Sequence, residues 1–71
     1  MAMKNKRRVN VGKIRTRLGL SQSKFAERYG LSVRTVQGWE TRWELDQATW
    51  LLIRLIERHP EEIAKWIAEV N

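Results

Sequence analysis

The sequence predicts an all-α domain made of five short helices. Apolar residues recur at intervals of three and four residues from residue 11 onward, which is the period of an amphipathic helix. Residues that stop helices separate these segments, and residues that cap helix N-termini precede them. No alternating strand pattern, internal repeat or low-complexity stretch competes with this interpretation.

Three of the five helices have clear starts and stops outside the central segment. Asn10 is expected to cap the first helix, and Gly19 to end it. Asp46 is expected to cap a fourth helix that covers residues 47–58. Pro60 stops that helix and opens a fifth, because proline suits the first turn of a helix but disfavours its interior.

The remaining two helices lie in residues 21–40 and are joined by a tight turn. Ser21 caps the first of them, and Gly30 ends it in the left-handed conformation usual just after a helix. Ser32 caps the second. The side chains expected to face inward are Phe25, Ala26, Tyr29, Leu31, Val36 and Trp39. Ala26 is small enough to let the helices cross at about 90–120°. This pattern predicts a helix-turn-helix, which places its second helix in the DNA major groove.

The segment resembles the Cro/C1-type (XRE) helix-turn-helix family of bacterial and phage repressors. The matching positions are Gln22, Ala26, Gly30, Val36, Trp39 and Glu40. Residues 11–62 are similar to small phage autorepressors and HigA-type antitoxins of that family. The resemblance implies a five-helix, lambda-repressor-like DNA-binding domain. Family members often continue with a segment that contains Gly and Pro, whereas this chain has residues 41–45, TRWEL. Either the helix continues for half a turn, or Arg42 adopts a left-handed conformation.

Composition limits the protein to one small domain. The 71 residues include no cysteine and one histidine, which excludes disulfides and zinc sites of the Cys or multi-His type, and no cofactor is expected. No signal peptide is visible, and the longest apolar run, residues 50–53, is far shorter than the ~20 residues that span a bilayer. We therefore expect a soluble, cytoplasmic protein with no membrane partner.

Charge divides the chain into a basic half and a mildly acidic half. Residues 1–30 contain nine Lys or Arg and one Glu, whereas residues 31–71 contain five Lys or Arg and seven Asp or Glu. We expect residues 1–8 to be a disordered basic arm, and residues 9–71 to be the helix-turn-helix domain with C-terminal helices for packing and dimerisation. The arm residues Lys4, Lys6, Arg7 and Arg8 either follow the DNA backbone, enter a minor groove, or serve only solubility.

The last two helices carry apolar residues on more than one side. In the fourth helix one stripe is expected to pack on the helix-turn-helix: Ala48, Leu51, Leu52, Leu55 and Ile56. The apolar surplus predicts a dimer interface. Its expected residues are Trp50, Ile53, Trp66, Ile67 and Val70. The alternative is that Trp50 and Trp66 cover each other within one chain.

The outward side of the second helix of the pair is the expected DNA-reading surface. The predicted base contacts are Ser32, Val33, Arg34, Gln37, Gly38 and Thr41. Arg34 can bond to guanine O6 and N7, Gln37 can pair with adenine, and Val33 can rest on a thymine methyl. A phosphate contact or a solvated side chain is the alternative for Arg34.

Phosphate contacts are expected mainly around the start of the preceding helix. The predicted residues are Arg17, Ser21, Gln22, Ser23, Lys24 and Arg42. For Gln22 this role is implied by the family resemblance. Trp43 is the one candidate for an exposed aromatic among basic residues. No combination of nucleophile, base and orienting group is visible, so no enzymatic activity is expected.

These features together favour a sequence-specific, double-stranded-DNA-binding transcriptional repressor. It would act as a homodimer on a palindromic operator and regulate its own operon. One alternative is an antitoxin of a type II toxin–antitoxin pair, which binds a protein toxin through its acidic C-terminal end and autoregulates. Another is an RNA-binding or bridging module without sequence preference.

Overall fold

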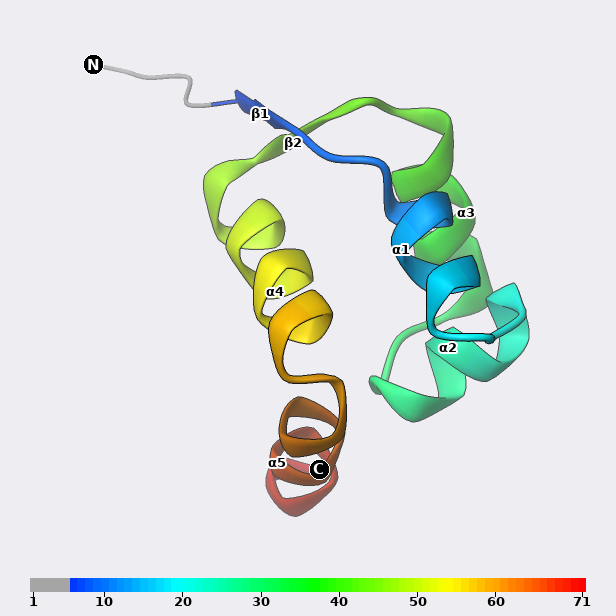
Figure 1. Cartoon of the computed structure of the whole chain (residues 1–71), viewed down its shortest axis with the longest axis vertical. Coiled ribbons are helices and arrows are strands. Elements are labelled where there is room, and N and C mark those ends of the chain that lie inside the picture. Colours follow the sequence, from blue (N-terminus) through cyan, green and yellow to red (C-terminus); the bar gives the residue numbers. More distant parts are fainter. Residues whose placement is uncertain (1–5) are drawn as a thin grey trace.

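The computed structural model describes residues 6–71, and five helices account for most of them (Figure 1). In chain order the elements are β1 (Lys6–Arg8), α1 (Val11–Arg17), α2 (Gln22–Arg28), α3 (Val33–Thr41), β2 (Glu44–Asp46), α4 (Gln47–Arg58) and α5 (Pro60–Val70). Helices α1–α3 lie on one side of the molecule, and α4 and α5 lie on the other (Figure 1). The predicted all-α, five-helix class is confirmed, with a two-stranded ribbon as a minor addition.

Local signals set the helix ends as predicted. Each of the four expected N-caps accepts a hydrogen bond from the backbone N–H three residues later: Asn10, Ser21, Ser32 and Asp46. Gly19 and Gly30 have φ values of 77° and 68°, the left-handed conformation that ends α1 and α2. Helix α5 begins at Pro60 with two acidic residues in its first turn.

Helix α3 continues beyond Glu40 to Thr41, close to the first alternative, and the left-handed conformation expected for Arg42 in the second alternative is wrong. Arg42 has φ −99° and ψ 139°, an extended conformation, and its backbone N–H donates to the Gly38 carbonyl at 3.2 Å. Because the chain leaves the helix in extended form, it enters β2 directly. An extended residue carries none of the strain that a left-handed arginine would have.

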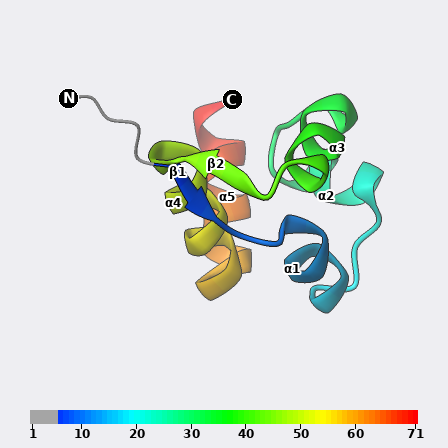
Figure 2. The ribbon, with the colours of Figure 1, turned by 90° about the horizontal axis from the view of Figure 1, so that it is seen from above.

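The expectation of a disordered arm is wrong for Lys6, Arg7 and Arg8. They form β1, which pairs antiparallel with β2 in the register Lys6–Asp46, Arg7–Leu45 and Arg8–Glu44 (Figure 2). Strands of three residues are too short to show a period, and the partner strand is distant in the sequence. The remaining arm residue, Lys4, lies outside the described residues.

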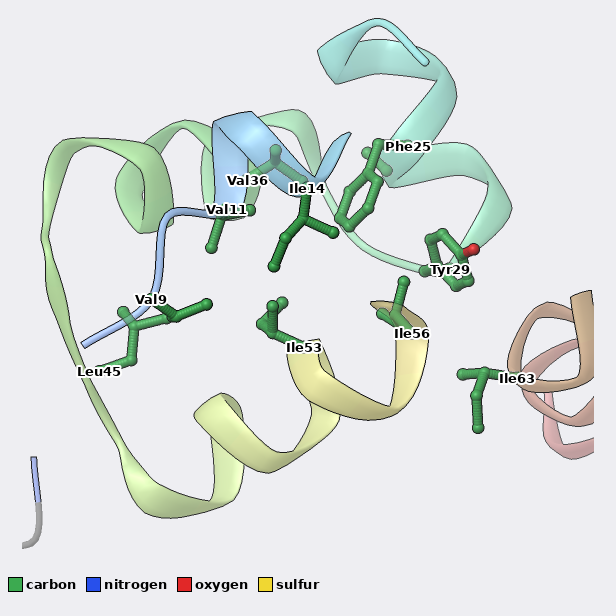
Figure 3. Close-up of a cluster of buried hydrophobic side chains, with 11 residues drawn as sticks. Val9, Val11, Ile14, Phe25, Tyr29, Val36, Leu45, Ile53, Ile56 and Ile63 are labelled. Carbon is green, nitrogen blue, oxygen red and sulfur yellow. The ribbon is translucent and has the colours of Figure 1, made fainter. Parts of the chain in front are cut away.

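The core sits where α4 meets the helix-turn-helix side of the molecule (Figure 3). Its buried side chains from α1–α3 and α4 are Val11, Ile14, Phe25, Ala26, Tyr29, Val36, Ile53 and Ile56. Val9 and Leu45 extend it beneath the ribbon, and Ile63 extends it toward α5. The Tyr29 hydroxyl donates to the Pro60 carbonyl at 3.0 Å, so α2 also holds the junction between α4 and α5.

The inward face of α4 differs from the predicted stripe. Two of its members, Leu52 and Ile56, pack on the core as predicted. Ala48 is exposed, Leu51 and Leu55 are 50% and 41% exposed, and Ile53 is fully buried instead. The assignment of Ile53 to a dimer interface is therefore wrong. Apolar residues cover more than half of this helix's circumference, so periodicity alone could not decide which side meets the core.

Two other predicted interface residues make contacts within the chain. Trp50 is half-buried, and the guanidinium groups of Arg7 and Arg54 lie 4.9 and 5.5 Å from its ring centroid. Ile67 packs against the core, and its Cγ2 would lie 3.1 Å from a Cβ added at Gly30. Neighbouring groups of the same chain therefore cover part of both side chains, which leaves less of their surface for a second copy than predicted.

Candidate nucleic-acid interface

The outward side of α3 carries the polar side chains that the sequence predicted there. Val36 is completely buried and Trp39 is half-buried, which fixes the inward side of the helix. The exposed positions of this segment are Ser32, Arg34, Thr35, Gln37 and Thr41, while Val33 and Gly38 are partly covered. The structure thus brings the predicted base-contacting residues together on one surface.

The predicted phosphate-contacting residues of α2 lie beside this surface. Ser23 and Lys24 are exposed, and the Ser21 hydroxyl accepts the Lys24 backbone N–H at 3.1 Å. The side-chain amide of Gln22 is held by hydrogen bonds within the chain, unlike that of an ordinary exposed residue at a helix start. Its Nε2 donates to Glu40 Oε1 at 3.0 Å, and its Oε1 accepts from Gln37 Nε2 at 3.4 Å. Gln22 therefore connects the start of α2 to the exposed row of α3, which consists of the outward-facing residues Arg34, Gln37, Gly38 and Thr41.

The carboxylate of Glu40, which accepts from Gln22, also forms an ion pair that joins α1 to α3. Arg15 donates through Nε to Glu40 Oε2 at 2.5 Å and through Nη2 to Glu40 Oε1 at 3.0 Å. The two side chains are only 15% and 17% exposed, so most of this bidentate contact is removed from water. Arg15 also donates through Nη1 to the Leu20 carbonyl at 2.9 Å, which ties the pair to the loop before α2.

The pKa values of both partners follow from this contact. The hydrogen bond to Glu40 raises the pKa of Arg15, and the same bond lowers the pKa of Glu40. The hydrogen bond from Gln22 also lowers the pKa of Glu40, against the opposing effect of desolvation. Glu40 is thus held as a carboxylate that accepts from two different helices.

Sequence reasoning gave no role to Arg15, Glu40 or Gly12. A Cβ at Gly12 would lie 3.3 Å from Glu40 Oε1, so the glycine leaves room for the carboxylate. The sequence offered one signal for this contact, because Glu40 occupies a family-matching position directly after the inward-facing Trp39. Its partner could not be chosen from the sequence, because several arginines lie within reach of such a helix.

Two arginines predicted as phosphate contacts are directed differently by the fold. Arg17 forms an ion pair with Glu57 of α4 at 3.6 Å, which places it toward α4 rather than with the α2 group. Arg42 turns back along α3, since its Nη2 would lie 3.4 Å from a Cβ added at Gly38. Arg42 therefore stays beside the exposed row, and Arg17 does not.

Two further findings concern only the described residues. Within residues 6–71, no three His, Cys, Asp or Glu side chains are grouped so that they could hold a metal ion. No helix in these residues combines the length and apolar character needed to cross a bilayer.

Comparison with known proteins agrees with this geometry. A family model described as helix-turn-helix matches residues 11–46, just over half of the chain, from the start of α1 to the end of β2. Neither the curated proteins nor the solved structures contain a match. The matched family consists of DNA-binding regulators that are generally not enzymes. The chain belongs to the Cro/C1-type (XRE) helix-turn-helix family of DNA-binding transcription regulators.

Proposed function

We propose that the protein is a sequence-specific transcriptional repressor that binds a palindromic operator as a homodimer and regulates its own operon. The observation that supports this best is the exposed polar row on α3, held in place by buried contacts behind it. A dimer bound over promoter elements would exclude polymerase by steric overlap.

In this proposal, α3 supplies the base contacts. Arg34 carries a fork of donors suited to guanine O6 and N7, and Gln37 suits adenine N6 and N7. Ser32 and Val33 lie at the leading end of the helix, where the partly covered Val33 can meet a thymine methyl. Gly38 has no side chain beyond hydrogen and Thr41 has a small one, so both would let the duplex approach.

Phosphate contacts would come from Ser21, Gln22, Ser23 and Lys24, with Arg42 at the other end of α3. Ser23 and Lys24 support this role through exposure, and Gln22 through the fixed position of its amide. Such contacts give affinity and register without sequence information. Arg17 is left out of this set, because its ion pair with Glu57 directs it elsewhere.

The homodimer is supported by apolar side chains left exposed on α4 and α5. Leu51 and Leu55, spaced one turn apart on α4, are 50% and 41% exposed, and Trp66 and Val70 on α5 are 55% and 85% exposed. Both helices lie on the side of the molecule opposite α1–α3 (Figure 1). This surface replaces the interface predicted from the sequence, of which only Trp66 and Val70 remain.

Basic side chains lie beside the exposed leucines of α4, and acidic side chains lie beside Trp66 of α5. Arg54 and Arg58 follow the exposed leucines of α4 at three-residue spacing, and Glu62 and Glu69 flank Trp66 on α5 at spacings of four and three. Arg54 already pairs with Glu57 of its own chain at 2.7 Å. A two-fold axis that brings α4 of one copy against α5 of the other would therefore place Arg58 near Glu62 of the second copy, at two equivalent contacts.

Charge reversal tests this interface directly. Arg58→Glu and Glu62→Arg should each weaken the dimer, and the double variant should restore it, as measured by sedimentation over a range of concentrations. Trp43→Ser removes an equally exposed indole elsewhere and should leave the dimer unchanged. A wild-type monomer at all concentrations would refute the dimer and favour the antitoxin alternative, in which a toxin covers this surface.

Selection of bound duplexes from a random DNA pool tests the regulator function. The enriched motif should have inverted symmetry, with half-site centres about 34 Å apart. Arg34→Ala should cost about 1–3 kcal/mol on that motif and relax one base position, whereas Lys24→Ala should weaken all sequences alike. Equal loss on specific and random DNA would show that Arg34 does not contact a base.

A further inference from the structure

An open groove of about 360 Å³ lies where α3 gives way to the two-stranded ribbon. Its lining residues are Lys6, Arg8, Arg42, Trp43 and Glu44. We propose that this groove binds the sugar–phosphate backbone of the operator strand beyond the base pairs that α3 contacts. This inference rests on the proposed DNA-binding function. It adds a second region of sequence-independent contacts to the phosphate contacts at the start of α2.

The ribbon presents its cations in a fixed arrangement. Lys6 and Arg8 are two residues apart on β1 and share one face of the strand, whereas Arg7 points to the other face. Arg7 lies over the Trp50 ring at 4.9 Å, and its cross-strand partner Leu45 is only 3% exposed. The inner face thus anchors the ribbon to α4 and the core, and the outer face is free for a ligand.

One side chain joins the groove to the recognition surface. Arg42 lines the groove, yet its Nη2 would lie 3.4 Å from a Cβ added at Gly38, in the exposed row of α3. Val9 also donates its backbone N–H to the Trp43 carbonyl at 3.2 Å, which fixes the ribbon against the segment that follows α3. A DNA strand lying along α3 would therefore continue into the groove.

The lining chemistry suits a phosphodiester strand. Three cations face one carboxylate, Glu44, whose ion pair with Arg8 is 3.8 Å long with side chains 81% and 57% exposed. Such an exposed pair is weak and exchanges readily for a phosphate. Trp43 is 60% exposed and combines an apolar ring with an N–H donor, which fits a deoxyribose next to a phosphate oxygen.

Salt dependence of DNA affinity tests the cations. The double variant Lys6→Ala/Arg8→Ala should keep the enriched motif of the wild type but reduce the slope of log K against log salt by about 3.6 for the dimer, since each of the four lost phosphate contacts, two per subunit, removes about 0.9. Lys65→Ala on the outer side of α5 is the control and should leave the slope unchanged. An unchanged slope in the double variant would overturn the proposal.

The opposing carboxylate gives a test in the other direction. Glu44→Gln should tighten binding about two- to fivefold, because a repulsive charge is removed beside the phosphates and the ion pair with Arg8 is released. Glu61→Gln removes the same charge from α5 and corrects for the change in net charge. Equal effects of the two variants would overturn the proposal that the groove binds the DNA backbone, without contradicting the repressor function. A wild type that binds no duplex would overturn both proposals.

Discussion

The ion pair between Arg15 and Glu40 is expected to stabilise the fold and to hold Gln22 beside α3. Glu40→Ala removes the acceptor of three hydrogen bonds, two from Arg15 and one from Gln22. A hydrogen bond to a charged group contributes about 1.5–3 kcal/mol, and the loss is not additive over bonds to one carboxylate. The side chains are 15% and 17% exposed, so water replaces little of what is lost. We expect Glu40→Ala to cost about 2–4 kcal/mol.

A double-mutant cycle separates the pair from its surroundings. Arg15→Ala, Glu40→Ala and the double variant should give a coupling free energy of about 1–3 kcal/mol in urea unfolding followed by circular dichroism. A change of 1 kcal/mol shifts the melting temperature of so small a domain by about 4–8 °C, so the single variants should be clearly resolved. The Arg15→Ala variant should also weaken DNA binding, because Glu40, which accepts from Gln22, is then no longer held in place by Arg15.

The pair between Arg54 and Glu57 on α4 is a matched control. It has a short N–O distance of 2.7 Å, but its side chains are 46% and 23% exposed. The same cycle on this exposed pair should give only about 0.2–1 kcal/mol. Coupling free energies of equal size in the two cycles would refute the conclusion that burial makes the Arg15–Glu40 contact the stronger one.

Four further predictions concern individual groups. Because Arg15 lowers the folded-state pKa of Glu40, its contribution to stability should be complete above pH ~4.5 and fall as the pH drops through the lowered pKa; Glu40→Gln should flatten acid unfolding over this range. Gly30→Ala should cost more than Gly19→Ala in urea unfolding, because both have positive φ but only at Gly30 would an added Cβ crowd a packed side chain, Ile67, whose Cγ2 would lie at 3.1 Å. Tyr29→Phe should cost about 0.5–1.5 kcal/mol through the lost hydrogen bond to the Pro60 carbonyl. Burial raises the pKa of Tyr29, so ultraviolet titration should show it ionising above pH 10 in the folded protein.

Local chemistry allowed much of the fold and part of the candidate site to be predicted. Cap residues, left-handed glycines and Pro60 act on the backbone within a few residues, so the sequence alone placed all five helices. The outward row of α3 was predictable for a similar reason, since a helix with Val36 and Trp39 inward must turn Arg34 and Gln37 outward.

Contacts between distant segments were decided only by the tertiary structure. The pairing of β1 with β2 joins strands too short to have a pattern of their own, and it turned three expected arm residues into an ordered ribbon. The partner of Glu40 had to be chosen among several arginines, and only the crossing of α1 and α3 selects Arg15.

Helix α4 shows most directly where sequence reasoning ends. Its twelve residues are apolar around so much of the circumference that two different sides could meet the core. The sequence determined that a helix lies here and where it begins and ends, because caps and breakers act locally. Packing against α1–α3 then buried Ile53 and left Leu51 and Leu55 exposed, because the side that faces the core depends on neighbours far away along the chain.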